Sequence, residues 1–449
     1  MAHVASTVGA YGRPRHPGRG DALSVRPAGA LGRGVAVATF AALLLAVVAL
    51  NAFRIGGFPI RGLATIAALI AATLFYFDVA KDVLRRNLLL LGLAAGLAVL
   101  GVFVSVVNGA SAADILRSLA EIHLQAAATI MVAAILAQVA GARACALAIV
   151  VVIGMSAIVA MAQMMDVQSA WALRRALGPL PNEELEGLNL LDRRPSGLSY
   201  SPIQLSTHLC LGFAAFVAVR ERLRGSASGA DPLVMPALAA LFAASIACAT
   251  RSPILGGFVF LAAYSLQRRN SWLPMFLILA AILAYFAWPL LMGVVESSAP
   301  RVTRADDNSA AARGTLAYYG FRLFMDNPLG FGFTFAPMTL WSSYWPELYM
   351  MAAPRGVREN DLHNYVVNMA NIYGVGILLL TPVIARLLWR SRSSLIFFIP
   401  YLVHILFHNS GPFYNDNVIW FVIAAIAAAH HGPGEPLRSR GSSRPMARI

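Results

Sequence analysis

The sequence predicts an all-α polytopic membrane protein with about twelve transmembrane helices and a large ordered loop before the last three of them. Hydrophobic residues make up 58% of the 449 residues and charged residues only 12%, which leaves too little polar surface to cover a soluble globule. Apolar runs of about 20 residues, the length that crosses about 30 Å of hydrocarbon, recur along nearly the whole chain. The spans therefore form the fold and do not merely anchor a soluble domain.

The predicted spans follow one another along most of the chain. We place them at residues 35–53, 60–78, 88–107, 118–139, 144–165, 203–219, 232–250, 253–267, 272–294, 366–385, 394–408 and 417–430. Because their number is even, both chain ends lie on the same side of the membrane.

The distribution of charge predicts which side that is. The chain carries a net charge of +14, and arginine supplies almost all of the positive charge, since Lys81 is the sole lysine. With both ends in the cytoplasm, 21 of the 35 Lys and Arg residues fall on that side, while most acidic residues fall on the other. This is the positive-inside pattern. The basic composition therefore reflects topology, so membrane lipids are expected partners and nucleic acid is not.

This orientation divides the chain into three parts. Residues 1–34 and 431–449 are rich in arginine, glycine and proline, which predicts disordered basic cytoplasmic tails. Residues 35–430 form the transmembrane domain. Two long loops of this domain, 166–202 and 295–365, face outward, and their aromatic and helix-compatible content predicts order.

Neither a disulfide framework nor a metal site is predicted. Cys145, Cys210 and Cys248 lie inside apolar segments without ligand spacing and are expected to be small core residues. Asp306 and Asp307 are adjacent in a loop and have no histidine or acid at a ligand spacing.

Arginines mark two outer helix ends. Arg193 and Arg194 precede Pro-Ser-Gly where the first long loop returns to the membrane, and Arg251 lies between two short spans. A guanidinium beside hydroxyl groups and a helix start suits an anion, because arginine offers a bidentate fork. The alternative is structural: such arginines snorkel to headgroups or sit at a hairpin tip.

Two further polar groups allow similar alternatives. Arg313 precedes a short helix of the second long loop and, taken alone, fits a solvated helix face. Arg117 and Glu121 are four residues apart, which predicts either an ion pair that fixes helix packing or a polar wall of a substrate groove.

His363 begins the stretch where chemistry is most strongly indicated. It lies with Asn364, Tyr365 and further amides where the second long loop enters an apolar span, and such polar groups must be hydrogen-bonded, solvated or bound to a polar ligand. A histidine at a helix end is often structural. Its ordinary pKa near neutral pH also suits general acid–base chemistry.

Together these segments resemble the O-antigen ligase and polymerase superfamily of bacterial inner-membrane proteins. The resemblance covers about residues 190–390 and rests on the order and common side of four elements. These are Arg194 to Gly197, Thr250-Arg251, an arginine-bearing helix ending in Pro328, Gly330 and Gly332, and His363-Asn364 followed by Gly374. The sequence departs from the pattern of this superfamily at one position. Members often carry a glutamate shortly before the glycine that follows His-Asn, but no acidic residue occurs here between Asp361 and Asp416.

The resemblance implies a metal-independent, inverting glycosyltransferase that needs no cofactor. Its donor is a polyprenyl-diphosphate-linked glycan, its acceptor is a glycan or lipid A-core hydroxyl, and its site faces the periplasm. Arg194 and Arg251 are then expected to hold the diphosphate, with Arg193 and Arg313 as further binders. His363 is expected to orient or deprotonate the acceptor, supported by Asn364 and Tyr365.

Two alternatives remain open from the sequence. Within the same chemistry, the protein extends a lipid-linked glycan as a polymerase and does not attach it to a final acceptor. From a different class, a polysaccharide or lipid transporter or flippase has similar apolar spans, but it is expected to carry broken helices near the midplane and charges on both leaflets.

Overall fold

The computed structural model describes residues 29–178, 194–224, 231–268 and 308–429. Within these ranges the chain is almost entirely helical, and the one sheet is a two-stranded hairpin of β1 (Arg54–Ile55) and β2 (Phe58–Pro59). The predicted all-α class is therefore confirmed for the described chain.

Most of the helices form one bundle. Its elements are α1 (Ala30–Ala49), α2 (Ile60–Phe75), α3 (Phe77–Val107), α4 (Ala112–Ser118), the π-helix η1 (Leu119–Leu124), α5 (Gln125–Ala140), α6 (Ala142–Met164), α7 (Gln168–Ala176), α8 (Pro202–Arg224), α9 (Val234–Ala247), α10 (Ser252–Arg268), α17 (Tyr365–Tyr373), the 3-10 helix η5 (Gly374–Leu380), α18 (Thr381–Leu395), the 3-10 helix η6 (Ile396–Phe398), α19 (Ile399–Leu406) and α20 (Val418–Ala428).

Six helical runs of the described chain are long and apolar enough to cross a membrane. They are Ala30–Ala49, Phe77–Val107, Ala112–Ala140, Ala142–Met164, Pro202–Arg224 and Tyr365–Leu406, and α2, α9, α10 and α20 are shorter apolar helices. The predicted span 272–294 lies outside the described residues. A multi-pass membrane protein is thus supported, and the total of about twelve spans stays a prediction.

The bundle core lies where α5, α6, α8 and α20 pack against one another. Its fully buried side chains include Ile135 of α5, Ile149 of α6 and Phe421 of α20. Cys145, Cys210 and Cys248 are buried free thiols, as the sequence predicted for small core residues.

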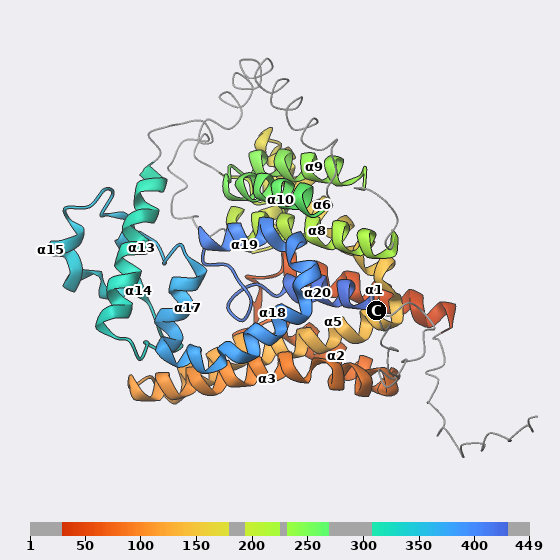
Figure 1. Cartoon of the computed structure of the whole chain (residues 1–449), viewed down its shortest axis with the longest axis horizontal. Coiled ribbons are helices and arrows are strands. Elements are labelled where there is room, and N and C mark those ends of the chain that lie inside the picture. The colour runs from red at the N-terminus through yellow and green to blue at the C-terminus, as the bar shows by residue number, and fades with distance from the viewer. Residues whose placement is uncertain (1–28, 179–193, 225–230, 269–307, 430–449) are drawn as a thin grey trace, which may run out of the picture.

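Residues 308–364 form a separate helical unit, which we call the lobe. It consists of α13 (Asn308–Asp326), α14 (Pro337–Leu340), the 3-10 helix η4 (Trp341–Tyr344), α15 (Trp345–Leu348) and α16 (Gly356–Glu359). The lobe has its own buried core, made by Leu316, Tyr319, Leu323, Leu348, Val357 and Leu362. Figure 1 shows α13, α14 and α15 at one end of the bundle, which we call the lobe end.

Gly330, Gly332 and Gly374 join the lobe to the bundle. The turn after α13 lies backbone to backbone on the break between α17 and η5, where Phe331 N donates to Asn371 O at 2.7 Å and Val375 N donates to Pro328 O at 2.8 Å. Gly330 and Gly374 both have positive φ, and a Cβ on Gly330 would lie 2.5 Å from Gly374 N. Side chains at this junction would push the two segments apart.

The predicted pair of Arg117 and Glu121 is part of a structural ion-pair network. Arg117 Nε lies 3.2 Å from Glu121 Oε1, and Arg54 adds a bidentate contact with the same carboxylate at 2.8 and 3.0 Å. The network therefore ties the β1–β2 hairpin to the start of the α5 run, as expected for an ion pair that fixes helix packing.

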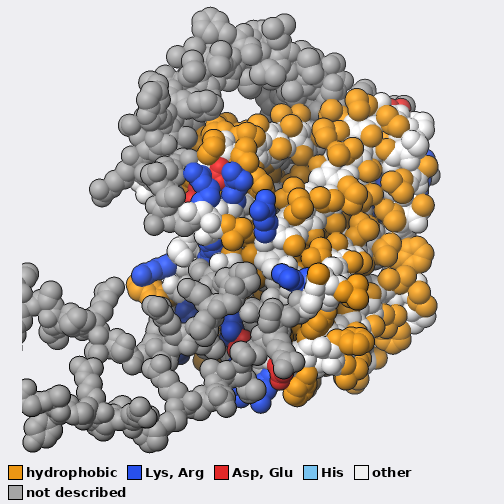
Figure 2. All heavy atoms as spheres, turned by 90° about the vertical axis from the view of Figure 1, so that its right-hand side faces the viewer, with side chains coloured by type: hydrophobic (Ala, Val, Ile, Leu, Met, Phe, Trp, Pro, Cys, Tyr) orange, Lys and Arg blue, Asp and Glu red, His pale blue; other side chains and the backbone are white. Residues whose placement is uncertain are grey.

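The opposite end of the bundle has a different surface. Figure 2 shows it largely covered by hydrophobic side chains, with Lys and Arg side chains gathered in its central part. At the C-terminal end of α8, Arg220 and Arg224 both pair with the buried carboxylate of Asp231.

Candidate functional site

His363 lies in the last residues of the lobe, immediately before α17. Asn364 caps that helix, because its side-chain oxygen accepts a hydrogen bond from Val367 N at 3.0 Å. The hydroxyl of Tyr365 donates to Pro412 O at 2.5 Å and so fixes the loop that follows α19. The two predicted supporting residues thus fix the backbone immediately after His363.

Arg194 sits on a segment that the bundle clamps tightly. Gln163 Oε1 accepts from the backbone N–H groups of Ser196 and Gly197 at 3.0 and 2.9 Å, and Leu198 N donates to Ser156 Oγ at 3.0 Å. Gly197 has a φ of +62°, and a Cβ there would overlap the Ser156 carbonyl. The guanidinium of Arg194 is therefore carried by a fixed backbone.

That guanidinium reaches the turn between α9 and α10. Arg194 Nη2 donates to Ala249 O at 3.1 Å. The next residue, Thr250, is buried and shares hydroxyl contacts with Ser206 at 2.5 Å and with Cys248 at 3.1 Å. Arg251 follows as an exposed side chain directly before α10, so it lies at the edge of this group and not inside it.

The guanidiniums of Arg313 and Arg194 act on His363. Burial is the largest cause that lowers the pKa of His363 from 6.5 to about 4; the positive charges of Arg313 and Arg194 act in the same direction, and an interaction with the Asp361 backbone opposes them. The expectation that this pKa lies near neutral pH is therefore wrong, because sequence reasoning took no account of burial beside two arginines. His363 is a neutral imidazole at neutral pH.

Two histidines that sequence reasoning missed complete the cluster. His408 is 2% exposed, and its ring centroid lies 6.1 Å from that of His363 and 4.5 Å from that of His404. His404 bonds Ser252 Oγ at 2.8 Å through Nδ1 and Thr207 Oγ1 at 3.1 Å through Nε2. Their spacing of four residues at the end of an apolar helix was the available signal.

Two buried imidazole nitrogens of the cluster have no hydrogen-bond partner. The Nδ1 atoms of His363 and His408 are buried without a hydrogen-bond partner, whereas both ring nitrogens of His404 are bonded. Among the described residues, the three histidines do not form a group that could hold a metal ion. Burial and nearby positive charges also keep the pKa of His408 below its ordinary value.

Among the described residues, the structure brings three predicted site residues together and places a fourth at their edge. His363, Arg313 and Arg194 interact electrostatically at the lobe end, and Arg251 borders them two residues beyond the carbonyl that Arg194 holds. Arg193 lies outside the described residues.

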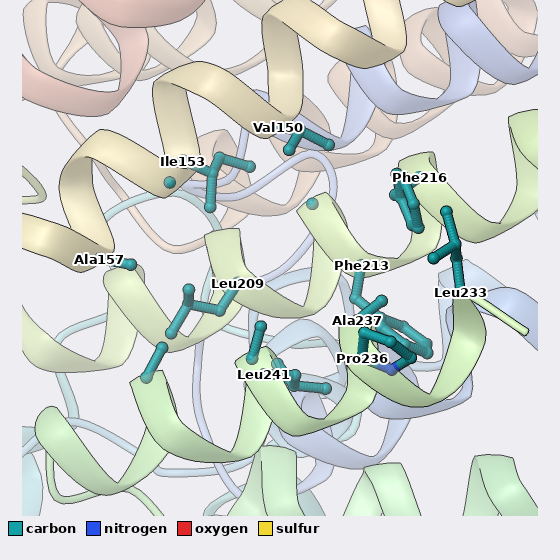
Figure 3. A pocket seen from close by; sticks show the side chains of 14 residues that line it. Val150, Ile153, Ala157, Leu209, Phe213, Phe216, Leu233, Pro236, Ala237 and Leu241 are labelled. Atoms are coloured by element: carbon teal, nitrogen blue, oxygen red, sulfur yellow. The ribbon is translucent and has the colours of Figure 1, made fainter.

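An apolar groove lies between α6, α8 and α9. It has a volume of about 340 Å³, and Figure 3 shows Val150, Ile153, Leu209, Phe213 and Leu241 along its walls. Ala157 also lines the groove, and its neighbour Ser156 contacts the Arg194–Leu198 segment. The groove therefore extends along the bundle toward the segment that carries Arg194.

Comparison with known families identifies the central part of this chain. Residues 236–381 match the family described as O-antigen ligase. This region is similar to the O-antigen ligase family over about a third of the chain. The superfamily resemblance predicted from the sequence is thereby confirmed. No curated protein matches the chain.

The O-antigen ligase region contains only part of the cluster. It includes Arg251, Arg313 and His363, and it ends before His404 and His408. Arg194 precedes it. Arg313 and His363 therefore belong both to the matched region and to the cluster.

Proposed function

We propose that the protein transfers a glycan from a polyprenyl-diphosphate carrier to a sugar hydroxyl at the periplasmic face of a bacterial inner membrane. The observation that carries the proposal is the buried cluster of His363, His408 and His404, with ring centroids 6.1 and 4.5 Å apart, on which the guanidiniums of Arg313 and Arg194 act electrostatically. The O-antigen ligase match supports glycan transfer of the ligase or polymerase type.

Arg194 and Arg313 are assigned to the diphosphate. When the bond between the anomeric carbon and the diphosphate oxygen breaks, negative charge grows on the leaving oxygen, and fixed guanidiniums stabilise that charge more than they stabilise the ground state. Arg251 at the edge of the cluster, and Arg193, are assigned to the outer phosphate oxygens. This form of catalysis needs no metal ion or cofactor.

His363 is assigned to the acceptor hydroxyl. Its buried Nδ1 is available to accept a hydrogen bond from that hydroxyl and to orient it toward the anomeric carbon. The hydroxyl oxygen forms the new bond as the diphosphate leaves from the other face, which inverts the anomeric centre. The hydroxyl proton passes to His363 late, when the attacking oxygen is already partly bonded and acidic, so a weak base suffices.

The apolar groove supports a lipid-linked donor. A polyprenyl chain has no polar atoms, and Leu209, Phe213 and Leu241 offer it an apolar wall below the segment of Arg194. A chain lying there would present its diphosphate to the guanidinium at the lobe end.

A reconstituted transfer assay tests the proposal. Purified protein in proteoliposomes is given labelled lipid-linked glycan and acceptor, and product and released diphosphate are measured. We expect Arg194→Ala and Arg313→Ala to lose donor binding and transfer, and His363→Ala to retain donor while transfer slows by about 10²–10⁴-fold. Arg322→Gln is the matched control, because Arg322 lies on the same helix and pairs with exposed Glu347 at 3.0 Å.

Two results would contradict the proposal. Transfer at the wild-type rate in Arg194→Ala, Arg313→Ala and His363→Ala at equal protein levels would show that the cluster serves helix packing and not catalysis. Uptake of intact lipid-linked glycan into vesicles without release of diphosphate would assign the protein to transport.

A further inference from the structure

Three aromatic side chains form a continuous strip on the lobe. Trp341, Trp345 and Tyr349 are spaced four residues apart along η4 and α15. The ring centroids of Trp341 and Trp345 are 5.4 Å apart and those of Trp345 and Tyr349 are 5.8 Å apart. The guanidinium of Arg358 lies 4.7 Å from the Trp341 ring centroid. The ring planes meet at 83° and 58°, so the three rings and this cation form a contiguous, stepped cluster, which we call the aromatic strip.

The aromatic strip is only partly explained by packing within the lobe. Trp341 contacts the lobe core, but Tyr349 is 64% exposed and Trp345 is half-buried. Ser342, Ser343 and Glu347 are exposed polar neighbours along the same segment. Large aromatic side chains in water beside hydroxyl groups are typical of a surface that binds a ligand with both apolar and polar faces.

The position of the aromatic strip argues against a membrane anchor. Figure 1 places α15 at the far side of the lobe, beyond the end of α3, which is the longest apolar helix. Tryptophan and tyrosine anchor proteins at the headgroup level, near the ends of the spans. A strip that lies farther out faces the aqueous phase.

The aromatic strip and His363 belong to the same packed unit. Leu348 of α15 and Leu362 are buried in the same lobe core. Leu362 directly precedes His363 in the chain. A molecule held on the strip is therefore held at a fixed position relative to His363.

We propose that Trp341, Trp345 and Tyr349 form a platform that binds the extended glycan of the substrate. The inference rests on the proposed function and adds where the sugar chain is held outside the reacting site. Sugar rings carry slightly positive C–H groups on their faces, which pack on the negative face of an aromatic ring, while their hydroxyls bond polar neighbours such as Ser342 and Ser343. A chain of several sugars covers more than one ring, and a single sugar repeat does not.

Direct binding measurements test this platform separately from catalysis. The probe is the lipid-linked glycan isolated from membranes of the source cells, together with the soluble glycan released from it by mild acid, in long-chain and single-repeat fractions. Affinity is measured on the purified full-length protein by tryptophan fluorescence and calorimetry. We expect Trp345→Ala with Tyr349→Ala to weaken long-chain binding about 10-fold or more and single-repeat binding less.

Two further variants distinguish stacking from folding. Trp345→Phe with Tyr349→Phe keeps the aromatic faces and should restore most of the affinity. Trp389→Ala is the matched control, because Trp389 is also an exposed tryptophan beside an arginine, Arg392, on α18 away from the lobe. Thermal stability of each variant is measured in the same detergent.

The outcomes separate the platform from the proposed function. Unchanged long-chain affinity in the double alanine variant overturns the platform even if transfer continues. Unchanged glycan affinity together with weaker association with anionic vesicles would make the strip a membrane anchor. A third outcome is that glycan binding depends on the strip while the wild-type protein performs no transfer. This result would support the platform and contradict the proposed function.

Discussion

Donor binding is expected to raise the pKa of His363 and so make it a better base. In the free protein, burial and the charges of Arg313 and Arg194 lower this pKa from 6.5 to about 4. That depression corresponds to about 3 kcal/mol of free energy disfavouring the protonated ring. A bound diphosphate would place negative charge beside the same guanidiniums and cancel their effect, while the effect of burial would remain.

The pH dependence of transfer checks this expectation. The acidic limb of the pH profile of kcat/KM reports the pKa of His363 in the free protein, and its midpoint is expected near pH 4. The acidic limb of kcat reports the pKa in the donor complex, and its midpoint is expected about one pH unit or more higher. Arg313→Gln should raise the limb of kcat/KM toward 6.5, and Arg322→Gln should leave it in place. Equal limbs for both parameters, or a limb near 6.5 in the free wild-type protein, would refute the reasoning.

Protein stability must be followed in the same experiment. Because the folded protein holds His363 neutral with a lowered pKa, the unfolded chain binds more protons between pH 6.5 and 4. Stability therefore falls as the pH drops through that window and is highest above pH 6.5 with respect to this group. A thermal melting curve at each pH separates loss of fold from protonation of the site.

Three further predictions concern orientation, charge geometry and the lobe junction. A reporter that is active only in the periplasm should work when fused after Ser342 and fail at the C-terminus, and the reverse result would overturn the orientation. Arg194→Lys should recover only part of the transfer lost in Arg194→Ala, because lysine lacks the bidentate fork; full recovery at matched protein levels would show that charge alone suffices. Gly330→Ala should lower the melting temperature and the transfer rate together, since its Cβ would lie 2.5 Å from Gly374 N, and a variant with wild-type melting and transfer would show that the junction is not rigid.

Sequence reasoning succeeded where a local pattern dictates structure. Apolar runs predicted the membrane helices, because every buried backbone group in hydrocarbon must be bonded within a helix. The glycines at 330, 332 and 374 were recognised as turn or helix signals, and the structure shows two of them, Gly330 and Gly374, in mutual contact. A positive φ is common at a turn glycine and could be expected at these positions. The contact between Gly330 and Gly374 could not be expected, because it joins segments more than forty residues apart in the chain.

The candidate site was predicted only in part for a related reason. His363 and Asn364 are adjacent in sequence, so their place at a helix start was readable. His408 was not recognised, since its relation to His363 depends on how α19 returns beside α17. The lowered pKa of His363 also could not be predicted from the sequence, because burial and the charge of Arg194 on another segment depend on the tertiary structure.

The lobe explains how a site assembled from distant segments keeps its geometry. Arg313 lies near the start of α13, and the glycine junction fixes the turn after the other end of that helix. The lobe core then ties α13 to Leu348 and Leu362, and thus to both the aromatic strip and His363. A glycan on the strip, the guanidinium of Arg313 and the imidazole of His363 are therefore held in fixed positions relative to one another. This arrangement suits a reaction in which one substrate is held by its lipid in the bundle and a sugar chain is held by the lobe, because the fixed junction keeps Arg313 on the lobe and Arg194 on the bundle near the same diphosphate.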